Sequence, residues 1–292
     1  MRWRKSRQSR NVDDRRGQRA SRGGRGMGRG KLSGGAGLLL LVVVVLLGGD
    51  PRQVLQLLVG DGGSVAAPSQ TRTTPANDES AQFLSAVLGM TEDVWSEIFR
   101  QNGATYQAPT MVLFTDAVQS ACGFNTSATG PFYCPPDQNL YLDTGFFDQL
   151  AGMGGAGDFA QAYVIGHEVG HHIQTLAGTS SWMRQLQGGR SQVEANELQV
   201  LMELQADCYS GVWAHHANRR EQVLEPGDVD EGLAAAAAIG DDRLQRRAGR
   251  SVSPESFTHG TSAQRQQWLG TGLRTGDIDA CDTFGQAGYV RR

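Results

Sequence analysis

Residues 159–176 read FAQAYVIGHEVGHHIQTL and contain an H-E-x-x-H sequence at positions 167–171. The apolar residues before and after the two histidines predict a helix of suitable length. On a helix with 3.6 residues per turn, side chains four positions apart share one face, so His167 and His171 can reach one zinc ion. Glu168 lies one step round the helix, where its carboxylate can take a proton from an activated water. This stretch predicts half of a metallopeptidase site.

Two glycines, Gly166 and Gly170, lie directly before the histidines. A glycine inside a helix is less favourable than an alanine by roughly 1 kcal/mol, so two within about one turn need a reason. We expect these small residues to leave room for a metal ion and a substrate.

A second acidic pattern, Glu203-Leu204-Gln205-Ala206-Asp207, lies in a predicted helix from about residue 191 to 217. Catalytic zinc usually takes three protein ligands and leaves one position for water. Glu203 is the expected third ligand, and Asp207 is expected to accept the outer N–H of one of the two histidines. Residues 178–189 are rich in Gly and Ser, so we expect a loop there, followed by a helix that returns antiparallel to the first.

Other residues compete for the ligand role. Glu194 and Glu197 have no acidic residue four positions later, which favours a solvated helix face. Direct ligation by Asp207 is the main alternative to Glu203. His172 points about 100° away from His171 around the helix, so we expect it to be a packed or polar neighbour of the site.

Five segments spread along the chain resemble one bacterial family. They are residues 1–4 (MRWR), 130–135 (GPFYCP), 167–174 (HEVGHHIQ), 203–208 (ELQADC) and 257–265 (FTHGTSAQR). Together, and in this order, they are similar to the bacterial putative neutral zinc metallopeptidase family, whose zinc site is gluzincin-like. The resemblance covers essentially the whole chain and implies a membrane-anchored, zinc-dependent peptidase.

Charge is distributed unevenly. The first 31 residues hold twelve Lys and Arg against Asp13 and Asp14, although the whole chain has a formal net charge of −3. Residues 32–49 follow without a single charge, and residues 38–47 are wholly aliphatic. Positive charge before an apolar segment is typical of the cytoplasmic flank of a membrane helix, so we discount nucleic-acid binding. The predicted organisation is a basic cytoplasmic arm (1–31), a transmembrane anchor (32–49), a linker (50–80) and a metallopeptidase domain (81–288).

The apolar run is as short as the core of a signal peptide. Against cleavage, the preceding region is long and no small-x-small site closely follows Leu47. We therefore expect an uncleaved single-pass anchor in a bacterial cell membrane, with the catalytic domain on the extracytoplasmic side.

Cysteines occur at positions 122, 134, 208 and 281, an even number that suits an exported, disulfide-bonded chain. Cys122 and Cys134 bracket a Gly-containing turn. Cys208 and Cys281 would then tie the second metal-site helix to the C-terminal tail. Four cysteines allow three connectivities, so this pairing is a preference.

The remaining patterns predict an α+β, zincin-like fold. We expect a small β-sheet packed on a helical bundle that carries the H-E-x-x-H helix and the Glu-bearing helix, preceded by one transmembrane helix. Predicted helices cover residues 83–99, 228–245 and 262–273, and predicted strands cover 109–114 and 139–143, with 132–133 as a third candidate. These strands have two interpretations. In the first, one strand lines the substrate cleft above the metal helix. In the second, the strands form only a small structural hairpin.

His259 lies on a predicted loop before a helix. Zinc peptidases often place a cationic or hydroxyl donor opposite the metal, to stabilise the oxyanion of the tetrahedral intermediate. His259 is the best candidate by residue type, and a loop histidine beside a helix cap at Thr261 or Ser262 is the alternative. Tyr163 and Tyr209 are further candidate donors, although core packing is commoner at their helix positions.

The sequence therefore predicts a zinc-dependent peptidase that acts on peptides or proteins. In it, Zn²⁺ is bound by His167, His171 and Glu203, and Glu168 is the general base. The alternative is a membrane-tethered, zinc-containing binding or assembly module without turnover. Glu168 argues against that alternative, because a purely structural site has no use for a base and more often has a fourth protein ligand.

Overall fold

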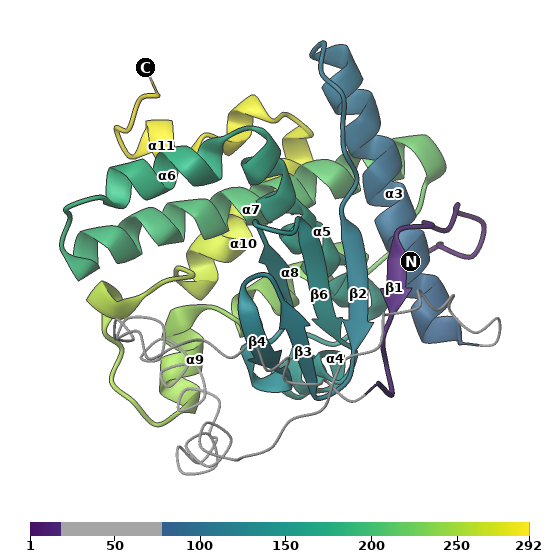
Figure 1. Cartoon of the computed structure of the whole chain (residues 1–292), viewed down its shortest axis with the longest axis horizontal. Coiled ribbons are helices and arrows are strands. Elements are labelled where there is room, and N and C mark those ends of the chain that lie inside the picture. The colour runs from purple at the N-terminus through teal and green to yellow at the C-terminus, as the bar shows by residue number, and fades with distance from the viewer. Residues whose placement is uncertain (19–77, 292) are drawn as a thin grey trace, which may run out of the picture.

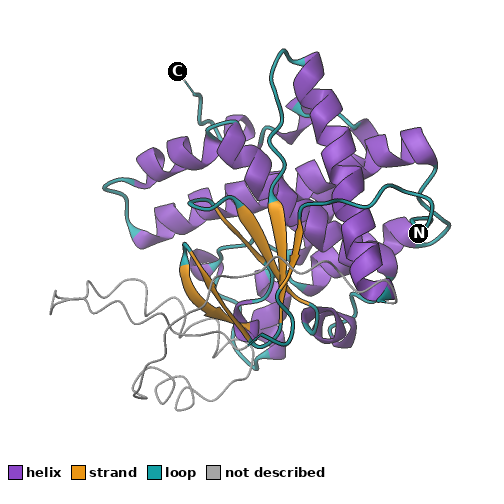
Figure 2. Ribbon diagram, turned by 45° about the vertical axis from the view of Figure 1, so that its right-hand side comes forward, coloured by secondary structure: helices purple, strands orange, loops and turns teal. Residues whose placement is uncertain are grey.

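The structure is a computed structural model that describes residues 1–18 and 78–291. A small sheet lies against a larger group of helices, which confirms the predicted mixed α+β class (Figure 1, Figure 2). The helices are α3 (Glu79–Gln101), α4 (Phe146–Gly152), α5 (Asp158–Leu176), α6 (Thr179–Gln187), α7 (Gln192–Glu221), α8 (Asp228–Ala238), α9 (Asp241–Arg247), α10 (Ser262–Thr275) and α11 (Thr283–Gln286).

The main sheet has four strands in the order β1-β2-β6-β5. They are β1 (Val12–Asp14), β2 (Thr110–Phe114), β5 (Phe132–Cys134) and β6 (Asn139–Asp143), and a separate hairpin pairs β3 (Ala117–Ser120) with β4 (Gly123–Thr126). Strand β2 pairs in parallel with both β1 and β6, while β5 runs antiparallel to β6 at one edge. Central parallel strands are covered on both faces, which explains the continuous apolar run MVLF of β2.

Helices α5 and α7 run antiparallel, as predicted. They also approach each other very closely, and Gly166 and Gly170 of α5 have a different role from the one expected. A Cβ atom on Gly170 would lie 2.9 Å from the backbone of Ala206, and one on Gly166 would lie 2.4 Å from Ser210 Oγ. The prediction that these glycines leave room for metal and substrate is therefore wrong. They let α7 approach α5, which brings the acidic residues of α7 close to the two histidines.

Two expected segments differ in the structure. Residues 178–189 were expected to form a loop but contain α6, because Met183 packs against Leu198, Met202 and Phe284 in a small apolar cluster. The single helix expected over residues 228–245 is two helices, α8 and α9, which are separated at Gly240.

The N-terminal residues also correct the expected organisation. Residues 1–18 belong to the folded domain, because β1 pairs with β2 and the side chains of Met1 and Trp3 are buried in the core. The prediction of a separate basic arm over residues 1–31 is therefore wrong for residues 1–18. The predicted anchor (32–49) and nearly all of the predicted linker lie outside the described residues. Within the described ranges, no helix combines the length and apolar character that crossing a membrane requires.

Both preferred disulfides are present. Cys122 pairs with Cys134 and joins the β3–β4 hairpin to β5, and Cys208 pairs with Cys281 and joins α7 to the C-terminal segment. No free cysteine remains among the described residues.

Candidate metal centre

The three predicted metal ligands meet where α5 crosses α7. Glu203 Oε2 lies 3.1 Å from His167 Nε2 and 3.4 Å from His171 Nε2. The three side chains are largely buried and form one of two groups of potential metal ligands within the described residues. The tertiary structure thus brings His167 and His171, which lie on one helix, together with Glu203, which follows His171 by 32 positions in the sequence.

These separations fit a zinc ion. Ligand atoms at about 2.0–2.1 Å from zinc in a tetrahedral arrangement lie roughly 3.3 Å apart. The two distances to Glu203 match the edges of such a tetrahedron. Two imidazoles and one carboxylate also form the ligand set typical of catalytic zinc, which keeps a fourth position for water.

Asp207 fixes the orientation of His167. Its Oδ1 lies 2.8 Å from His167 Nδ1, so the imidazole donates this proton and leaves Nε2 free to face Glu203. The predicted outer role of Asp207 is therefore assigned to His167, and its carboxylate does not belong to the group of candidate ligands.

Gln174 orients the imidazole of His171 in the way that Asp207 orients His167. The sequence pattern did not identify this residue. Gln174 Oε1 lies 2.9 Å from His171 Nδ1, and Gln174 Nε2 donates to the Met202 carbonyl and to Gln205 Oε1. The spacing of three residues between His171 and Gln174 on one helix was the available signal, because such residues are neighbours on the helix surface.

The sequence pattern also did not identify Arg265, which contacts both Asp207 and Tyr163. Its guanidinium forms a two-pronged contact with Asp207, with Nε to Oδ2 at 2.8 Å and Nη2 to Oδ1 at 2.9 Å. Tyr163 donates its hydroxyl hydrogen to Asp207 Oδ1 at 2.6 Å and accepts a hydrogen bond from Arg265. Arg265 is only 2% exposed and Asp207 is fully buried, so each charge depends on the other.

The carboxylates control the protonation of the metal-free site. Burial alone would raise the pKa of Asp207, but Arg265 and His167 lower it to about 2. Burial alone would lower the pKa of His167, but Asp207 and Glu203 raise it to about 9. A metal ion must therefore displace a proton from His167 at neutral pH, which makes metal binding weaker as the pH falls.

Glu168 and His172 occupy different surroundings on α5. The Glu168 side chain is buried and its charge contributes to the raised pKa of His171, after the larger effects of burial (lowering) and Glu203 (raising). His172 is fully buried, and its Nδ1 and Nε2 lie 3.1 Å from Tyr133 Oη and 2.6 Å from the Gln107 carbonyl. As expected, His172 faces away from the ligand group. Of the rival acids, Glu194 forms the N-terminal capping box of α7 with Ser191.

His259 lies beside the site on a loop fixed by Asp241. Oδ2 of Asp241 accepts backbone N–H groups of Thr258, His259 and Gly260 at 2.7, 2.6 and 3.1 Å. Its Oδ1 lies 3.3 Å from His259 Nδ1, and the imidazole side chain is 46% exposed. Burial lowers the pKa of His259, but Asp241 and the nearby Glu203 raise it overall. The loop thus presents a histidine that favours its cationic form.

A family model described as "Putative neutral zinc metallopeptidase" matches residues 1–284. The chain belongs to this family. Zinc is the metal of the family, which agrees with the ligand set and its geometry.

Relatives of this chain occur in bacteria. The chain is 46% identical to "Uncharacterized protein YpfJ" of Escherichia coli (strain K12) over 292 residues, which covers 98% of this chain and 100% of that protein. It is 42% identical to "Uncharacterized protein Rv2575" of Mycobacterium tuberculosis (strain ATCC 25618 / H37Rv) over 231 residues, which covers 75% of this chain and 76% of that protein. No solved structure matches the chain, so the zincin-like description of the fold stays a prediction.

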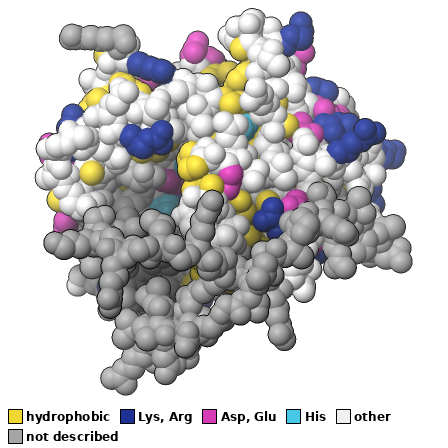
Figure 3. All heavy atoms as spheres, in the orientation of Figure 1, with side chains coloured by type: hydrophobic (Ala, Val, Ile, Leu, Met, Phe, Trp, Pro, Cys, Tyr) yellow, Lys and Arg dark blue, Asp and Glu magenta, His cyan; other side chains and the backbone are white. Residues whose placement is uncertain are grey.

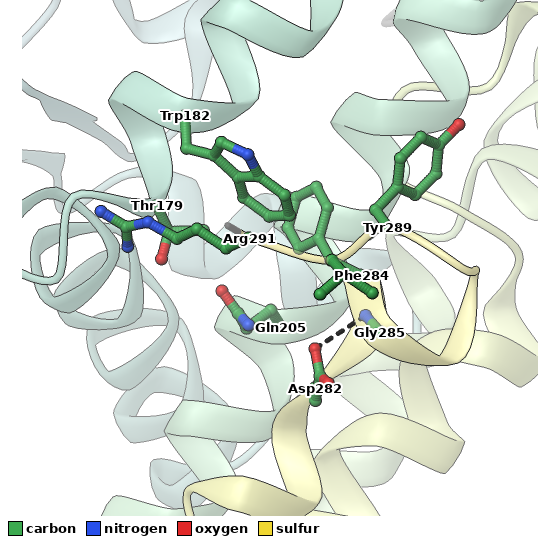
Figure 4. Close-up of a pocket in the computed structure, with 9 residues that line it drawn as sticks. Thr179, Trp182, Gln205, Asp282, Phe284, Gly285, Tyr289 and Arg291 are labelled. Carbon is green, nitrogen blue, oxygen red and sulfur yellow. Dashed lines mark hydrogen bonds between the residues drawn. The ribbon is translucent and has the colours of Figure 1, made fainter.

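A separate cavity of the metallopeptidase lies between α6 and the C-terminal residues. It has a volume of about 250 Å³. Figure 4 shows Trp182 against Phe284 in this cavity, with Tyr289 nearby and Asp282 bonded to the Gly285 backbone. None of the candidate zinc ligands lines it, and we assign it no role.

The outer partners of the two histidines give a quantitative prediction. Asp207→Asn and Gln174→Met should each weaken zinc binding by roughly 10- to 100-fold, because such partners orient the imidazole and raise its basicity. Competition with a chromophoric chelator measures the affinity. Gln192→Met is a matched control, since Gln192 is exposed at the start of α7 and bonds Asn196 and no candidate ligand. Equal affinities for wild type, Asp207→Asn and Gln174→Met would contradict this account of the site.

Proposed function

We propose that this protein is a peptidase that hydrolyses peptide bonds of protein or peptide substrates. The observation that carries the proposal is a carboxylate, Glu168, next to a ligand group that has three members rather than four. A closed structural zinc site uses four protein ligands and needs no base. Zinc bound at this site would polarise the substrate carbonyl and acidify a water molecule.

The protein side chains supply the proton transfers and the orientation. Glu168 takes the proton from the attacking water and passes it to the amine that leaves. Asp207 and Gln174 hold the two imidazoles with their Nε2 atoms inward. Arg265 keeps Asp207 ionised, so that His167 retains its hydrogen bond through the reaction.

His259 is proposed as the donor that stabilises the oxyanion. Its pKa is raised by Asp241 and Glu203 against the effect of burial, which favours the cationic form. Asp241 holds the loop backbone through three hydrogen bonds and faces the imidazole Nδ1, so that Nε2 remains available. A hydrogen-bond donor that is already oriented stabilises negative charge as it develops in the transition state.

Strand β5 is proposed to align the substrate. It is an edge strand, it runs antiparallel to β6, and it lies against α5, where the Tyr133 ring packs edge-on to His172. An edge strand presents unpaired backbone groups that an extended peptide can use. The alternative role of β5 is structural, since its Cys134 joins it to the β3–β4 hairpin.

The alternative function is a zinc-containing binding or assembly module without turnover. It predicts a metal-loaded protein that is inert towards unfolded and folded substrates. The incomplete ligand group and the buried Glu168 beside it favour the peptidase.

Cleavage of an unfolded protein by the zinc-loaded full chain tests the proposed function. We expect fragments to accumulate, activity to disappear after treatment with a zinc chelator, and activity to return when zinc is restored. Circular dichroism before and after chelation separates loss of metal from loss of fold. A folded, zinc-loaded chain that leaves all substrates intact would favour the binding module.

We also propose an extracytoplasmic location for the domain. Both disulfides lie within it, and disulfides persist in oxidising compartments.

A further inference from the structure

Residues on either side of the undescribed stretch 19–77 are bound to each other. Arg16 pairs with Asp14 at 2.5 Å and with Asp78 at 2.8 Å. Asp78 is the N-cap of α3, where its side chain accepts the backbone N–H of Ala81. The chain therefore leaves the described domain and re-enters it at one point on its surface.

The segment before that point is an integral part of the domain. Its strand β1 adds to the sheet in parallel register, with Val12 opposite Met111. The backbone N–H of Ser9 donates to the Ser85 carbonyl, and the Ser85 hydroxyl donates back to the Ser9 carbonyl. At its start, the Trp3 ring packs edge-on against Phe83.

Charge also attaches this segment to α3. Arg7 forms ion pairs with Glu92 at 2.8 Å and Asp93 at 2.7 Å, and donates to the Gly89 carbonyl at 3.0 Å. Basic and acidic side chains lie side by side over this part of the surface in Figure 3. Four of the basic residues at the start of the chain, Arg2, Arg4, Arg7 and Arg16, therefore have acidic partners within the domain, which argues against assigning these four to a cytoplasmic arm.

From these contacts we infer that residues 1–18 and the metallopeptidase domain lie on the same side of any membrane. A chain whose two ends are held on one folded body must cross a bilayer an even number of times. A return crossing needs about 20 apolar residues. Charges at Asp50, Arg52, Asp61 and Arg72 interrupt the sequence after residue 49, so no second run of that length exists before α3.

The consequence is that residues 1–18 and residues 78–291 occupy the same compartment. This inference is independent of the peptidase activity, because it rests on the packing of residues 1–18 alone. It replaces the single-pass arrangement that the charge pattern suggested.

Cysteine labelling of the full chain in bacterial spheroplasts tests the topology. Lys5→Cys and Arg250→Cys place one reactive thiol on an exposed position in each part, and the four native cysteines are paired. In intact spheroplasts, a membrane-impermeant maleimide should either label both variants or label neither, because both thiols lie on the same side of the membrane. Labelling of only one of the two in intact spheroplasts, with both labelled after permeabilisation, would overturn the inference.

A second measurement tests the packing that carries the argument. A Cβ atom on Gly89 would lie 2.3 Å from the Arg7 carbonyl oxygen, so Gly89→Ala should lower the melting temperature of the purified full chain. If residues 1–18 were a free arm, the surface of α3 would be open there, and alanine would raise the melting temperature through its helix propensity. Gly152→Ala is the matched control, since nothing lies within 4 Å of the new atom. A rise at both positions would overturn the inference.

Discussion

Glu168→Gln is expected to reduce the rate of peptide hydrolysis by about 10²- to 10⁴-fold while zinc content stays unchanged. Glutamine keeps the shape of the side chain but cannot accept the proton of the attacking water. The ligand group of His167, His171 and Glu203 is untouched by the change. Steady-state kinetics on one peptide, together with metal analysis of the same preparation, measures both quantities.

The control is Glu197→Gln, the same chemical change at an exposed position of α7. It should leave both the rate and the zinc content at wild-type values. A Glu168→Gln variant that cleaves at the wild-type rate with zinc bound would exclude Glu168 as the base.

Arg265→Met is expected to lower the free energy of unfolding by about 3–5 kcal/mol. The change leaves the fully buried Asp207 carboxylate without the two hydrogen bonds that now balance its charge. Methionine fills a similar length of buried space, so the loss reports mainly the unpaired charge. Denaturant unfolding monitored by circular dichroism gives the free energy.

The double variant Arg265→Met with Asp207→Asn tests the cause. Removing both charges should recover part of the lost stability, and the double-mutant cycle then gives the coupling between the two side chains. Arg274→Met near the end of α10, where the arginine is exposed, should change stability by less than about 0.5 kcal/mol. Equal losses in the single and double variants would show that packing of Arg265, and not its pairing with Asp207, matters.

Local patterns were enough to predict much of the chain. The helices over residues 83–99 and 262–273 and the strand over 139–143 were anticipated, because periodicity and turn residues act over short distances. Strand β1 was missed because its three residues read VDD, and only pairing with the apolar β2 makes them a strand. Helix α6 was missed because its apolar partners come from α7 and α11.

By itself, the sequence determined the pair of histidines, the candidate base between them and the candidate third ligand. Helix geometry alone places His167 and His171 on one face, and the acidic spacing of Glu203 and Asp207 marks a second helix. Chemistry carried by residues within one or two turns can be predicted without a fold.

Only the tertiary structure decided how these parts are held. The choice of Asp207 for His167 and Gln174 for His171 depends on how α5 crosses α7, and the glycines of α5 set that distance. Arg265 reaches Asp207 from a helix 58 positions away in sequence. The placement of residues 12–14 in the sheet follows from long-range pairing with β2, which overrides the local pattern of basic residues before an apolar run. Contacts between distant segments leave no local signal, because each depends on packing that forms only when the whole domain folds.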